Sequence, residues 1–530
     1  MGNERGTRRI GVFGWGVVAP KAPDVDTFAA RLESPGSWLN AFDGFGPSNF
    51  LTGTPAFDFE AYEPWVSERF PPNRFPALNK KMGYPTQYAI GAFIQSLSQN
   101  AGLEAALRDA GLRTQVIVGG GLHDLPTYYD ASLAYARTQR RWDRFWSTPQ
   151  NNSALEEYLA DRVAPSDDLP PDPETLPVDE RDEAEDRWWH YWAARSPQLD
   201  EYLTELRAIE SLSVEGDVES GKASLIRRKA AAVAALRKKW KSPEPPWNGV
   251  TSNVLWNIGN TPASQISMMG QLTGMCYAPF AACSTFGYSL RLGMRAITHG
   301  EADFAVIGAT DPPPHPMSVG TFYNARVLSA DGELSKPLTG LRGTHVAGGA
   351  CVWIIGDLEH GRRLGFEALG MEPIAVGVSA DADHIITPSV EGPTSAIRAA
   401  FDEGGISPEA ITHWDLHATA TPGDYLEVET IRKVIGDRAV LSARKGTFGH
   451  GMGAGGGWEL TAQYLAAKSG VIPPTTLTPA ELNPEIGRIH ANFVFDHACR
   501  FPDDRIGCVG KLSMGVGGIN ACVISRPYDA

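Results

Sequence analysis

Three residues that lie far apart in the sequence carry side chains that could act together in nucleophilic catalysis: Cys283, His417 and His450. Cys283 stands just before an amphipathic run at 286–297 that has the period of a helix. A cysteine at the start of a helix lies beside unpaired amides and the positive end of the dipole, which stabilise a thiolate and lower its pKa. A cysteine at an apolar helix start is more often a small buried hydrophobic residue, so the histidines decide the interpretation.

Each histidine is predicted to follow a strand and to open a turn of small residues. His417 comes directly after the apolar stretch 411–416, and His450 ends the segment Lys-Gly-Thr-Phe-Gly-His at 445–450. Small residues allow close approach of a ligand, and the carboxyl ends of strands are where α/β proteins place their chemistry. The glycine run 449–457 could be mistaken for a phosphate cradle, but it lacks the Gly-Lys-Ser/Thr ending of a P-loop.

Four segments together resemble the ketosynthase branch of the thiolase-like superfamily, the condensing enzymes of fatty acid and polyketide assembly. The nucleophile motif of that family is similar to 282–285, its first histidine motif to 417–421, its Lys-x-x-x-Gly-His motif to 445–450, and its glycine-rich closing motif to 513–520. The four motifs occur in the expected order. The resemblance covers most of the chain outside residues 125–250.

The resemblance implies a decarboxylative Claisen condensation in which Cys283 accepts an acyl group. His417 and His450 are implied to hydrogen-bond the carbonyl of a malonyl thioester and to stabilise the enolate that forms as carbon dioxide leaves. The backbone amides of Cys283 and Val516 match the positions of the family's oxyanion hole. Lys445 is implied to tune the charge of the site.

Further residues match supporting positions of the family. The family's lysine pairs with a glutamate at the position that Glu459 occupies. Thr419 and Thr421 match residues that bind the pantetheine arm of an acyl carrier, although threonines in a turn are also ordinary capping groups. Asp424 and Glu427 are expected to support the first histidine, but the loop before Asp424 is one residue shorter than the family's, so the resemblance fixes no precise role for them.

The sequence departs from the family around the expected acyl pocket. Met514 and Val516 stand where the family often has phenylalanines. This predicts smaller, softer side chains in the wall of the pocket and a different range of accepted acyl chains. Phe286, beside the nucleophile, stands where many relatives have glycine and is expected to occupy part of the pocket. Gly348 stands where a glutamate is usual. Simple variation in core packing is the alternative explanation of the softer wall.

The resemblance implies a five-layered α/β/α/β/α thiolase-like fold built from two related halves, at 1–363 and 364–530. Runs typical of strands recur in both halves, at 9–19, 114–119, 304–308, 350–356, 373–379, 411–416, 439–442 and 505–513. The active site is expected where the halves meet. Residues 125–252 exceed any ordinary loop and are predicted to form an inserted, mainly helical subdomain.

Two features of the insertion invite functional interpretation. A basic helix is predicted at 221–241, and because acyl carrier proteins are typically acidic it could steer a carrier by charge. A solvated helix face is the simpler interpretation and the one we favour. The tryptophan and tyrosine cluster at 188–192 is expected to form the small core of the insertion, or to pack on the body of the synthase, rather than to form a ligand site.

Composition bounds the remaining possibilities. The chain has 530 residues, 42% hydrophobic and 21% charged, with a net charge of −15 and no nucleic-acid-binding module, so nucleic acid is not an expected partner. No apolar run is long enough to cross a membrane, and the charged start has no secretory leader, which predicts a cytoplasmic protein. The six cysteines form no CxxC pair, so neither a metal nor a disulfide framework is expected.

We therefore expect a ketosynthase that lengthens a carrier-bound acyl chain, in a specialised rather than a housekeeping pathway. It would need no cofactor, because the acyl and malonyl groups arrive on the phosphopantetheine of an acyl carrier protein. The family implies a homodimer or a heterodimer of ketosynthase-like chains. Two alternatives remain: a non-catalytic partner subunit like the chain-length factors, which the intact Cys283 argues against, and an acyltransferase that passes the acyl group to an amine or alcohol.

Overall fold

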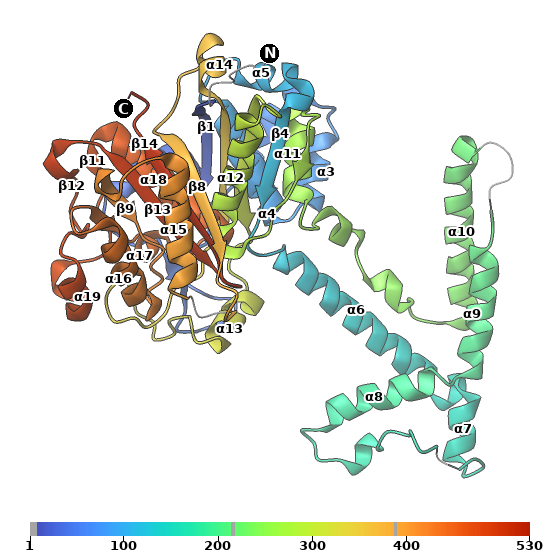
Figure 1. Ribbon diagram of the computed structural model, residues 1–530. Helices are drawn as coiled ribbons and strands as arrows, with labels where there is room; N and C mark the ends of the chain where they lie inside the picture. Colours follow the sequence, from blue (N-terminus) through green and yellow to red (C-terminus); the bar gives the residue numbers. More distant parts are fainter. Residues whose placement is uncertain (1–7, 165, 214–217, 386–388, 530) are drawn as a thin grey trace. The chain divides into compact units, whose positions relative to one another are not determined.

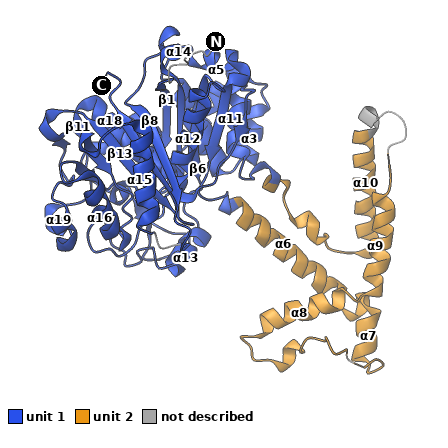
Figure 2. Ribbon diagram, in the orientation of Figure 1, with its two compact units in different colours: residues 1–126, 255–530 blue, residues 127–254 orange. Residues whose placement is uncertain are grey.

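The computed structural model describes residues 8–164, 166–213, 218–385 and 389–529. These residues form two compact units, shown in Figures 1 and 2. The first unit contains residues 1–126 and 255–530, and the second contains residues 127–254. The second unit is helical and covers nearly the same stretch as the subdomain that the sequence predicts.

The first unit contains two five-stranded mixed sheets. One sheet has the strand order β1 (Ile10–Val18), β7 (Gly349–Asp357), β6 (Phe304–Asp311), β4 (Thr114–Gly119) and β5 (Cys276–Tyr277). The other has the order β8 (Glu372–Ala380), β14 (Ile519–Arg526), β13 (Cys508–Gly515), β9 (Ile411–Asp415) and β10 (Val440–Ser442).

The two sheets repeat one pattern of strand directions. In the first sheet, β7 is antiparallel to both β1 and β6, and β4 and β5 run parallel to β6. In the second sheet, β14 is antiparallel to both β8 and β13, and β9 and β10 run parallel to β13. The chain is therefore built from two related halves, as the sequence predicted.

Helices form the remaining layers of the first unit. α12 (Thr285–Thr298) and α18 (Met452–Ser469) contact each other, and each contacts strands of both sheets, so this pair lies between them (Figure 1). The outer face of the first sheet is covered by α4 (Tyr84–Leu97) and α11 (Thr261–Gly270). The outer face of the second is covered by α15 (Glu391–Gly404) and α16 (Gly423–Ile435). The result is the predicted five-layered α/β/α/β/α arrangement.

The glycine run at 449–457 opens α18, where the two central helices approach closely. A Cβ on Gly457 would lie 2.5 Å from Cδ2 of Phe286 and 2.6 Å from Cβ of Cys351. Atoms at such distances overlap, so this close packing requires glycine at position 457. Helix packing accounts for this glycine without any phosphate-binding role.

Smaller elements complete the first unit. Its other helices are α1 (Val25–Leu32), α2 (Glu63–Arg69), α3 (Arg74–Lys81), α5 (Leu103–Asp109), α13 (Pro316–Asn324), α14 (Leu358–Arg363), α17 (Lys445–Phe448) and α19 (Pro484–Ile489). Its short strand pairs are β2 (Asn40–Ala41) with β3 (Leu51–Thr52), and β11 (Val471–Ile472) with β12 (Cys499–Arg500). Within the described part of the chain, no helix combines the length and the apolar character needed to cross a membrane.

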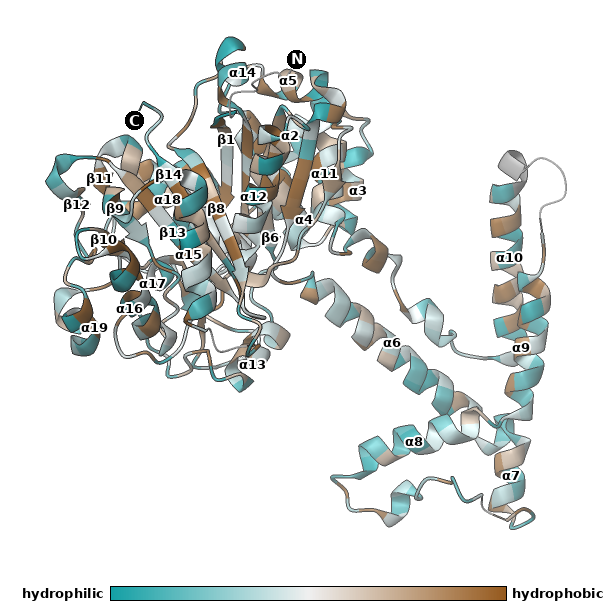
Figure 3. Cartoon of the chain, in the orientation of Figure 1, coloured by the Kyte–Doolittle hydropathy of each residue, from teal (hydrophilic) through white to brown (hydrophobic). Residues whose placement is uncertain are grey.

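The second unit is built from α7 (Ser153–Leu159), α8 (Arg181–Ala193), α9 (Pro197–Glu210), α10 (Val218–Trp240) and most of α6 (Leu125–Trp146). Its small core includes Trp142, Trp146 and Tyr202, whose rings lie 5.5 Å apart in each pairing. Figure 3 shows hydrophobic colour concentrated in strands such as β4, and mainly polar colour along α6 and α8. The buried area of this unit is therefore confined to a narrow apolar seam between its helices.

The aromatic cluster at 188–192 and the basic helix α10 both lie in this unit. Trp192 is buried and its ring lies 5.0 Å from Tyr158 and 5.9 Å from Trp188, so part of the aromatic cluster packs internally. On the basic helix α10, three cations pair with acidic side chains of the same unit: Lys229 with Glu210, Arg237 with Glu244, and Lys239 with Glu205. These pairs reduce the charge that α10 presents to solvent, which favours the solvated-face interpretation.

Candidate active site

Cys283 lies in a single 3-10 turn, Ala282–Ser284, that leads directly into α12. The turn is fastened to the hairpin formed by β13 and β14, because Ser284 Oγ donates to the carbonyls of Ser513 (3.0 Å) and Ile519 (2.8 Å). Ala282, just before the nucleophile, has a φ of 47°, a region that residues other than glycine rarely adopt. The nucleophile from the first half is thus held by the second half.

Cys283 is 7% exposed, and burial raises the pKa of its thiol to about 11. The charge of Lys445 and the backbone amides of Val516 and Cys283 act in the opposite direction, because they favour the thiolate. The lowered pKa predicted from the helix start is therefore wrong in direction: loss of solvent outweighs the helix terminus. The resting nucleophile is a thiol, and the two amides are close enough to its sulfur to favour the thiolate.

His417 and His450 lie together, with ring centroids 5.3 Å apart and ring planes at 80°. His417 is separated from the end of β9 by one residue, close to the predicted strand end. His450 does not follow a strand directly, because the short helix α17 separates it from β10. Its backbone is instead fixed by His345 and Ala347: the His450 amide donates to the His345 carbonyl (2.7 Å) and its carbonyl accepts from Ala347 (2.9 Å).

Both imidazoles are buried, and this lowers the pKa of each well below 6.5; the charge of Lys445 lowers both further. At neutral pH each ring is therefore uncharged, with one N–H that can donate and one nitrogen that can accept. Two neutral imidazoles that face one cavity can hydrogen-bond a carbonyl oxygen and the negative charge that develops on it.

Lys445 and Glu459 form the buried pair that the resemblance implied. Lys445 Nζ lies 2.7 Å from Glu459 Oε1 and donates to the His417 carbonyl at 2.5 Å. The second partner of this glutamate was not predicted from the sequence: Lys511 Nζ lies 2.9 Å from Glu459 Oε2. A single lysine in the otherwise apolar and small-residue strand β13 was the signal that could have found it.

Asp424 and Glu427 have defined roles despite the shortened loop. Glu427 accepts from the amides of His417 (2.6 Å) and Ala418 (2.8 Å). Asp424 accepts from the amides of Thr419 (2.8 Å) and Ala420 (3.1 Å), among others. Burial raises the pKa of Asp424 to about 6 and that of Glu427 to about 7, and the donating amides partly offset this rise. The two carboxylates hold the first histidine loop in place.

A third buried carboxylate, Asp311 at the end of β6, was also not predicted from the sequence. It accepts from the amides of Gly121 (2.8 Å), Leu122 (2.6 Å) and Ala454 (3.2 Å), so it ties the start of α18 to the loop after β4. Burial raises its pKa to about 7. An aspartate that ends a mainly apolar strand is a recognisable signal, because strand ends carry the site in this fold.

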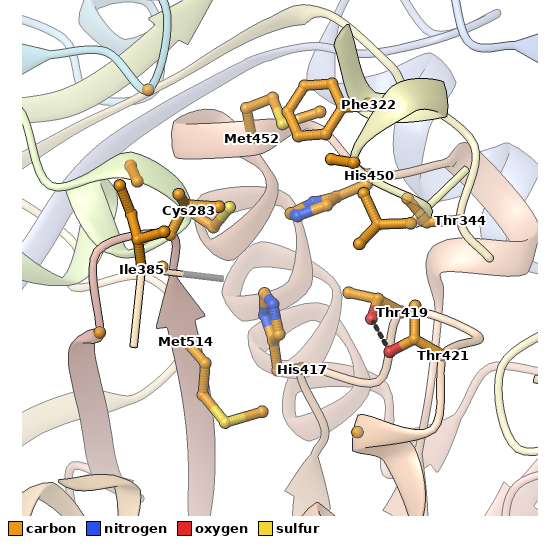
Figure 4. Close-up of a pocket in the computed structure, with 18 of the residues that line it drawn as sticks. Cys283, Phe322, Thr344, Ile385, His417, Thr419, Thr421, His450, Met452 and Met514 are labelled. Carbon is orange, nitrogen blue, oxygen red and sulfur yellow. Dashed lines mark hydrogen bonds between the residues drawn. The ribbon is translucent and has the colours of Figure 1, made fainter. Parts of the chain in front are cut away.

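The nucleophile and both histidines line one cavity of about 430 Å³. Figure 4 shows the side chains of Cys283, His417 and His450 directed into it. Of the other predicted site residues, the lining includes Thr419, Thr421, Asp424, Glu427, Met514 and Val516. The hydroxyls of Thr419 and Thr421 lie 2.9 Å apart. The walls also include residues that the sequence did not single out: Phe322, Thr344, Ile385 and Met452.

Two departures from the family have structural explanations. Phe286 does not line this cavity: it is fully buried between the central helices and packs edge-to-face on Trp353 at 5.1 Å, so its prediction as an acyl-pocket residue is wrong. Gly348 has no room for the usual glutamate, because a Cβ there would lie 2.0 Å from the carbonyl oxygen of Pro312. The backbone of this chain follows a path that only glycine permits.

Comparisons with known proteins agree with this geometry. Family models described as beta-ketoacyl synthase, N-terminal domain and beta-ketoacyl synthase, C-terminal domain match residues 228–360 and 373–478. The chain is 31% identical over 284 residues to a 3-oxoacyl-[acyl-carrier-protein] synthase 2 of Coxiella burnetii, a match that covers 51% of this chain and 67% of the relative.

Solved structures share the fold over nearly the whole chain. The ishigamide ketosynthase/chain length factor matches with a TM-score of 0.67 and 20% identity, covering 98% of this chain and all of that one. A type II PKS ketosynthase, solved with its acyl-carrier protein, matches with a TM-score of 0.64 and 16% identity over 98% of this chain and all of that one. These likenesses show the thiolase-like fold. The sequence matches show more: the chain belongs to the beta-ketoacyl synthase family, the acyltransferases that form carbon–carbon bonds.

Proposed function

We propose that this protein condenses an acyl group held on Cys283 with a malonyl thioester delivered by an acyl carrier protein. One observation carries the proposal: the Cys283 sulfur, two neutral imidazoles and two backbone amides that can bind an oxyanion meet at a single cavity. Each of these groups suits one step of a decarboxylative condensation.

In the first step, the Cys283 sulfur attacks the carbonyl carbon of an acyl thioester. The amides of Cys283 and Val516 bind the negative oxygen of the tetrahedral intermediate, an effect worth roughly 3 kcal/mol for each donor. The C–S bond to the carrier then breaks, and the carrier thiol leaves with the proton that Cys283 gives up. Because the resting thiol is protonated, its proton must leave as the new C–S bond forms.

In the second step, the malonyl thioester loses its carboxylate as carbon dioxide, and the electron pair of the broken C–C bond forms an enolate. His417 and His450 donate their N–H groups to the thioester oxygen, where the negative charge accumulates. The enolate carbon attacks the acyl carbonyl on Cys283. The tetrahedral intermediate collapses, Cys283 leaves as a thiolate and takes up a proton, and the lengthened 3-oxoacyl chain stays on the carrier.

Supporting residues hold the catalytic groups in position. Glu427 and Asp424 fix the backbone of the first histidine motif itself, and Lys445 holds the His417 carbonyl. Positioning at this precision matters, since a displacement of about 1 Å can cost about a hundredfold in rate. We propose that the hydroxyls of Thr419 and Thr421, which both line the cavity, hydrogen-bond the pantetheine arm of the carrier.

The partner, the assembly and the setting are also part of the proposal. An acyl carrier protein is the proposed donor, supported by the relative named for an acyl-carrier-protein synthase and by the ketosynthase solved with its carrier. We propose that the chain pairs with itself or with another ketosynthase-like chain, acts in the cytoplasm and uses no cofactor. Among the described residues, no group of three or more His, Cys, Asp or Glu is placed to hold a metal ion.

The experiment is intact mass measurement of the protein with acyl thioesters of pantetheine that carry short, medium or long chains, followed by malonyl-pantetheine. Wild type should gain the mass of the acyl group and lose it when the malonyl thioester is added, as a longer 3-oxoacyl product appears. Cys283→Ala should gain no adduct and make no product, while its fold is unchanged.

The two alternatives give different results in this experiment. A stable adduct that malonyl-pantetheine cannot discharge, but an amine or alcohol can, would establish an acyltransferase and overturn the condensation. No adduct with any donor would establish the non-catalytic partner subunit.

A further inference from the structure

Five charged side chains form a buried cluster beside the backbone that carries His417: Asp415, Arg444, Lys445, Glu459 and Lys511. Their side chains are at most 3% exposed. Glu459 is shared, with one oxygen 2.7 Å from Lys445 Nζ and the other 2.9 Å from Lys511 Nζ. Asp415 Oδ2 lies 3.2 Å from Arg444 Nε, and Asp415 Oδ1 lies 4.0 Å from Lys511 Nζ.

The cluster contains three cations and only two carboxylates. When all five groups are ionised, they carry one net positive charge among them. The buried carboxyl of Glu427 also faces Lys511, but burial raises its pKa to about 7, so at neutral pH it is only partly ionised and offsets only part of this charge. A buried charge without a full partner is costly, so this arrangement is not the most stable way to fill the space. Methionine in place of Lys511 would leave two complete pairs, Lys445 with Glu459 and Arg444 with Asp415. The third cation therefore calls for an explanation other than stability.

The cluster reaches the histidine backbone directly. Lys445 Nζ donates to the His417 carbonyl at 2.5 Å, and Lys511 Nζ donates to the carbonyl of the preceding residue, Leu416, at 3.4 Å. The charge of Lys511 lowers the pKa of both His417 and His450, as that of Lys445 does, in addition to the larger effect of burial.

Lys511 itself is held in the charged state. Its ammonium faces Glu459 on α18, Asp415 on β9 and Glu427 on α16, and these carboxylates raise its pKa although burial acts in the opposite direction. Lys445 on α17 shares Glu459 with it. Glu459 remains ionised for the same reason: burial raises its pKa, but the two lysines outweigh burial and lower it.

We propose that Lys511 is a positioning residue of the condensation site: by taking half of Glu459 from Lys445, it leaves one net positive charge behind His417 and His450. This inference rests on the condensation proposed above. The positive charge keeps both imidazoles neutral, so that they remain N–H donors. It also favours the step in which negative charge builds up on the enolate oxygen.

Two variants separate a role of charge from a role in packing. Lys511→Met removes the charge and keeps an apolar chain of similar length in β13. Adding Glu459→Gln to it removes one negative charge as well and restores the net positive charge of the cluster through Lys445. Lys433→Met is the matched control, because Lys433 is exposed and pairs with Glu429 at the surface (3.2 Å). Circular dichroism establishes that each variant is folded.

The readouts are carbon dioxide release from malonyl-pantetheine as a function of pH, and NMR titration of the histidine side chains. Lys511→Met should slow carbon dioxide release by roughly tenfold to a hundredfold. It should also move the acid limb of the pH profile, and the titration of His417 and His450, to higher pH. The double variant should recover part of the lost rate, and Lys433→Met should match wild type.

Three results would overturn the inference. An unchanged rate and unchanged histidine titration in folded Lys511→Met would show that the charge of Lys511 does not reach the site. A double variant slower than the single one would show that Lys511 acts through packing. If the rate fell but His417 and His450 titrated as in wild type, the inference would also be overturned, because the charge of Lys511 would not act on the histidines. If wild type itself released no carbon dioxide, the proposed function would fail, while the histidine titration would still test Lys511.

Discussion

Val516 provides a sharp test of how the cavity selects its acyl chain. Its side chain is 44% exposed and lines the cavity, while its backbone amide faces the Cys283 sulfur. A substitution at this position can therefore change the size of the cavity without removing the amide from the oxyanion site. Val516→Phe restores the residue that the family often carries, and it should narrow the range of accepted chains.

The size of the effect follows from the atoms added. Phenylalanine has four more carbon atoms than valine, so the ring removes room for about three or four methylene groups of an acyl chain. Each methylene that loses its buried place costs about 0.8 kcal/mol, which gives a loss of about 2–3 kcal/mol for chains long enough to reach the ring. Long chains should therefore acylate Cys283 roughly 30-fold to 200-fold more slowly, and short chains should be unaffected.

The assay is the rate of adduct formation on Cys283 for a series of acyl-pantetheine thioesters of increasing length. Val516→Leu, which adds one carbon atom, is the matched control and should give a smaller loss that begins at longer chains. An equal loss at all lengths would mean that the ring displaces the amide rather than closing the cavity. An unchanged length preference would show that position 516 does not gate the pocket.

Two further substitutions test the frame of the site. Glu427→Gln should lower kcat, because the amide nitrogen of glutamine cannot accept from Ala418 and the His417 loop shifts. The same variant should also reduce the pH dependence of the free energy of unfolding. The pKa of Glu427 is raised to about 7 in the folded state, so the protonated carboxyl stabilises the fold fully below about pH 4.5. This stabilisation falls by about 3 kcal/mol as pH rises through 7. A variant with the same pH dependence as wild type in chemical denaturation would refute this. Gly348→Ala should destabilise the fold by about 1–3 kcal/mol, because the added Cβ would lie 2.0 Å from the carbonyl oxygen of Pro312. Gly455→Ala is the control and should not destabilise the fold, because no atom lies within 4 Å of the added Cβ. Equal melting temperatures of the two variants would contradict the predicted clash.

Much of the first unit could be predicted because its signals are local. Each strand expected from an apolar run is present within a few residues of its predicted bounds, for example Thr114–Gly119 for β4 and Ile411–Asp415 for β9. β14 (Ile519–Arg526) was not predicted as a separate strand, because its first residues belong to the closing glycine-rich motif. The pairing of Lys445 with Glu459 was also predictable, because the resemblance implied it: Glu459 follows His450 by nine residues, as the family's glutamate follows its second histidine.

What could not be predicted depends on contacts between distant segments. Phe322, Ile385 and Met452 meet at the cavity from three separate parts of the chain, and no local pattern links them. The orientation of Phe286 depends on whether the space beside it is cavity or core, which the sequence does not determine. The direction of the Cys283 pKa shift depends in the same way on burial, which here outweighs the helix terminus.

The central claim is that loss of carbon dioxide and chain extension are one coupled event on Cys283. The most direct measurement uses protein acylated in advance on Cys283, with malonyl-pantetheine labelled in the carboxylate that should leave as carbon dioxide. The account predicts one labelled carbon dioxide and one 3-oxoacyl product for each adduct discharged. Discharge of the adduct without labelled carbon dioxide, or with transfer of the acyl group to another acceptor, would contradict it.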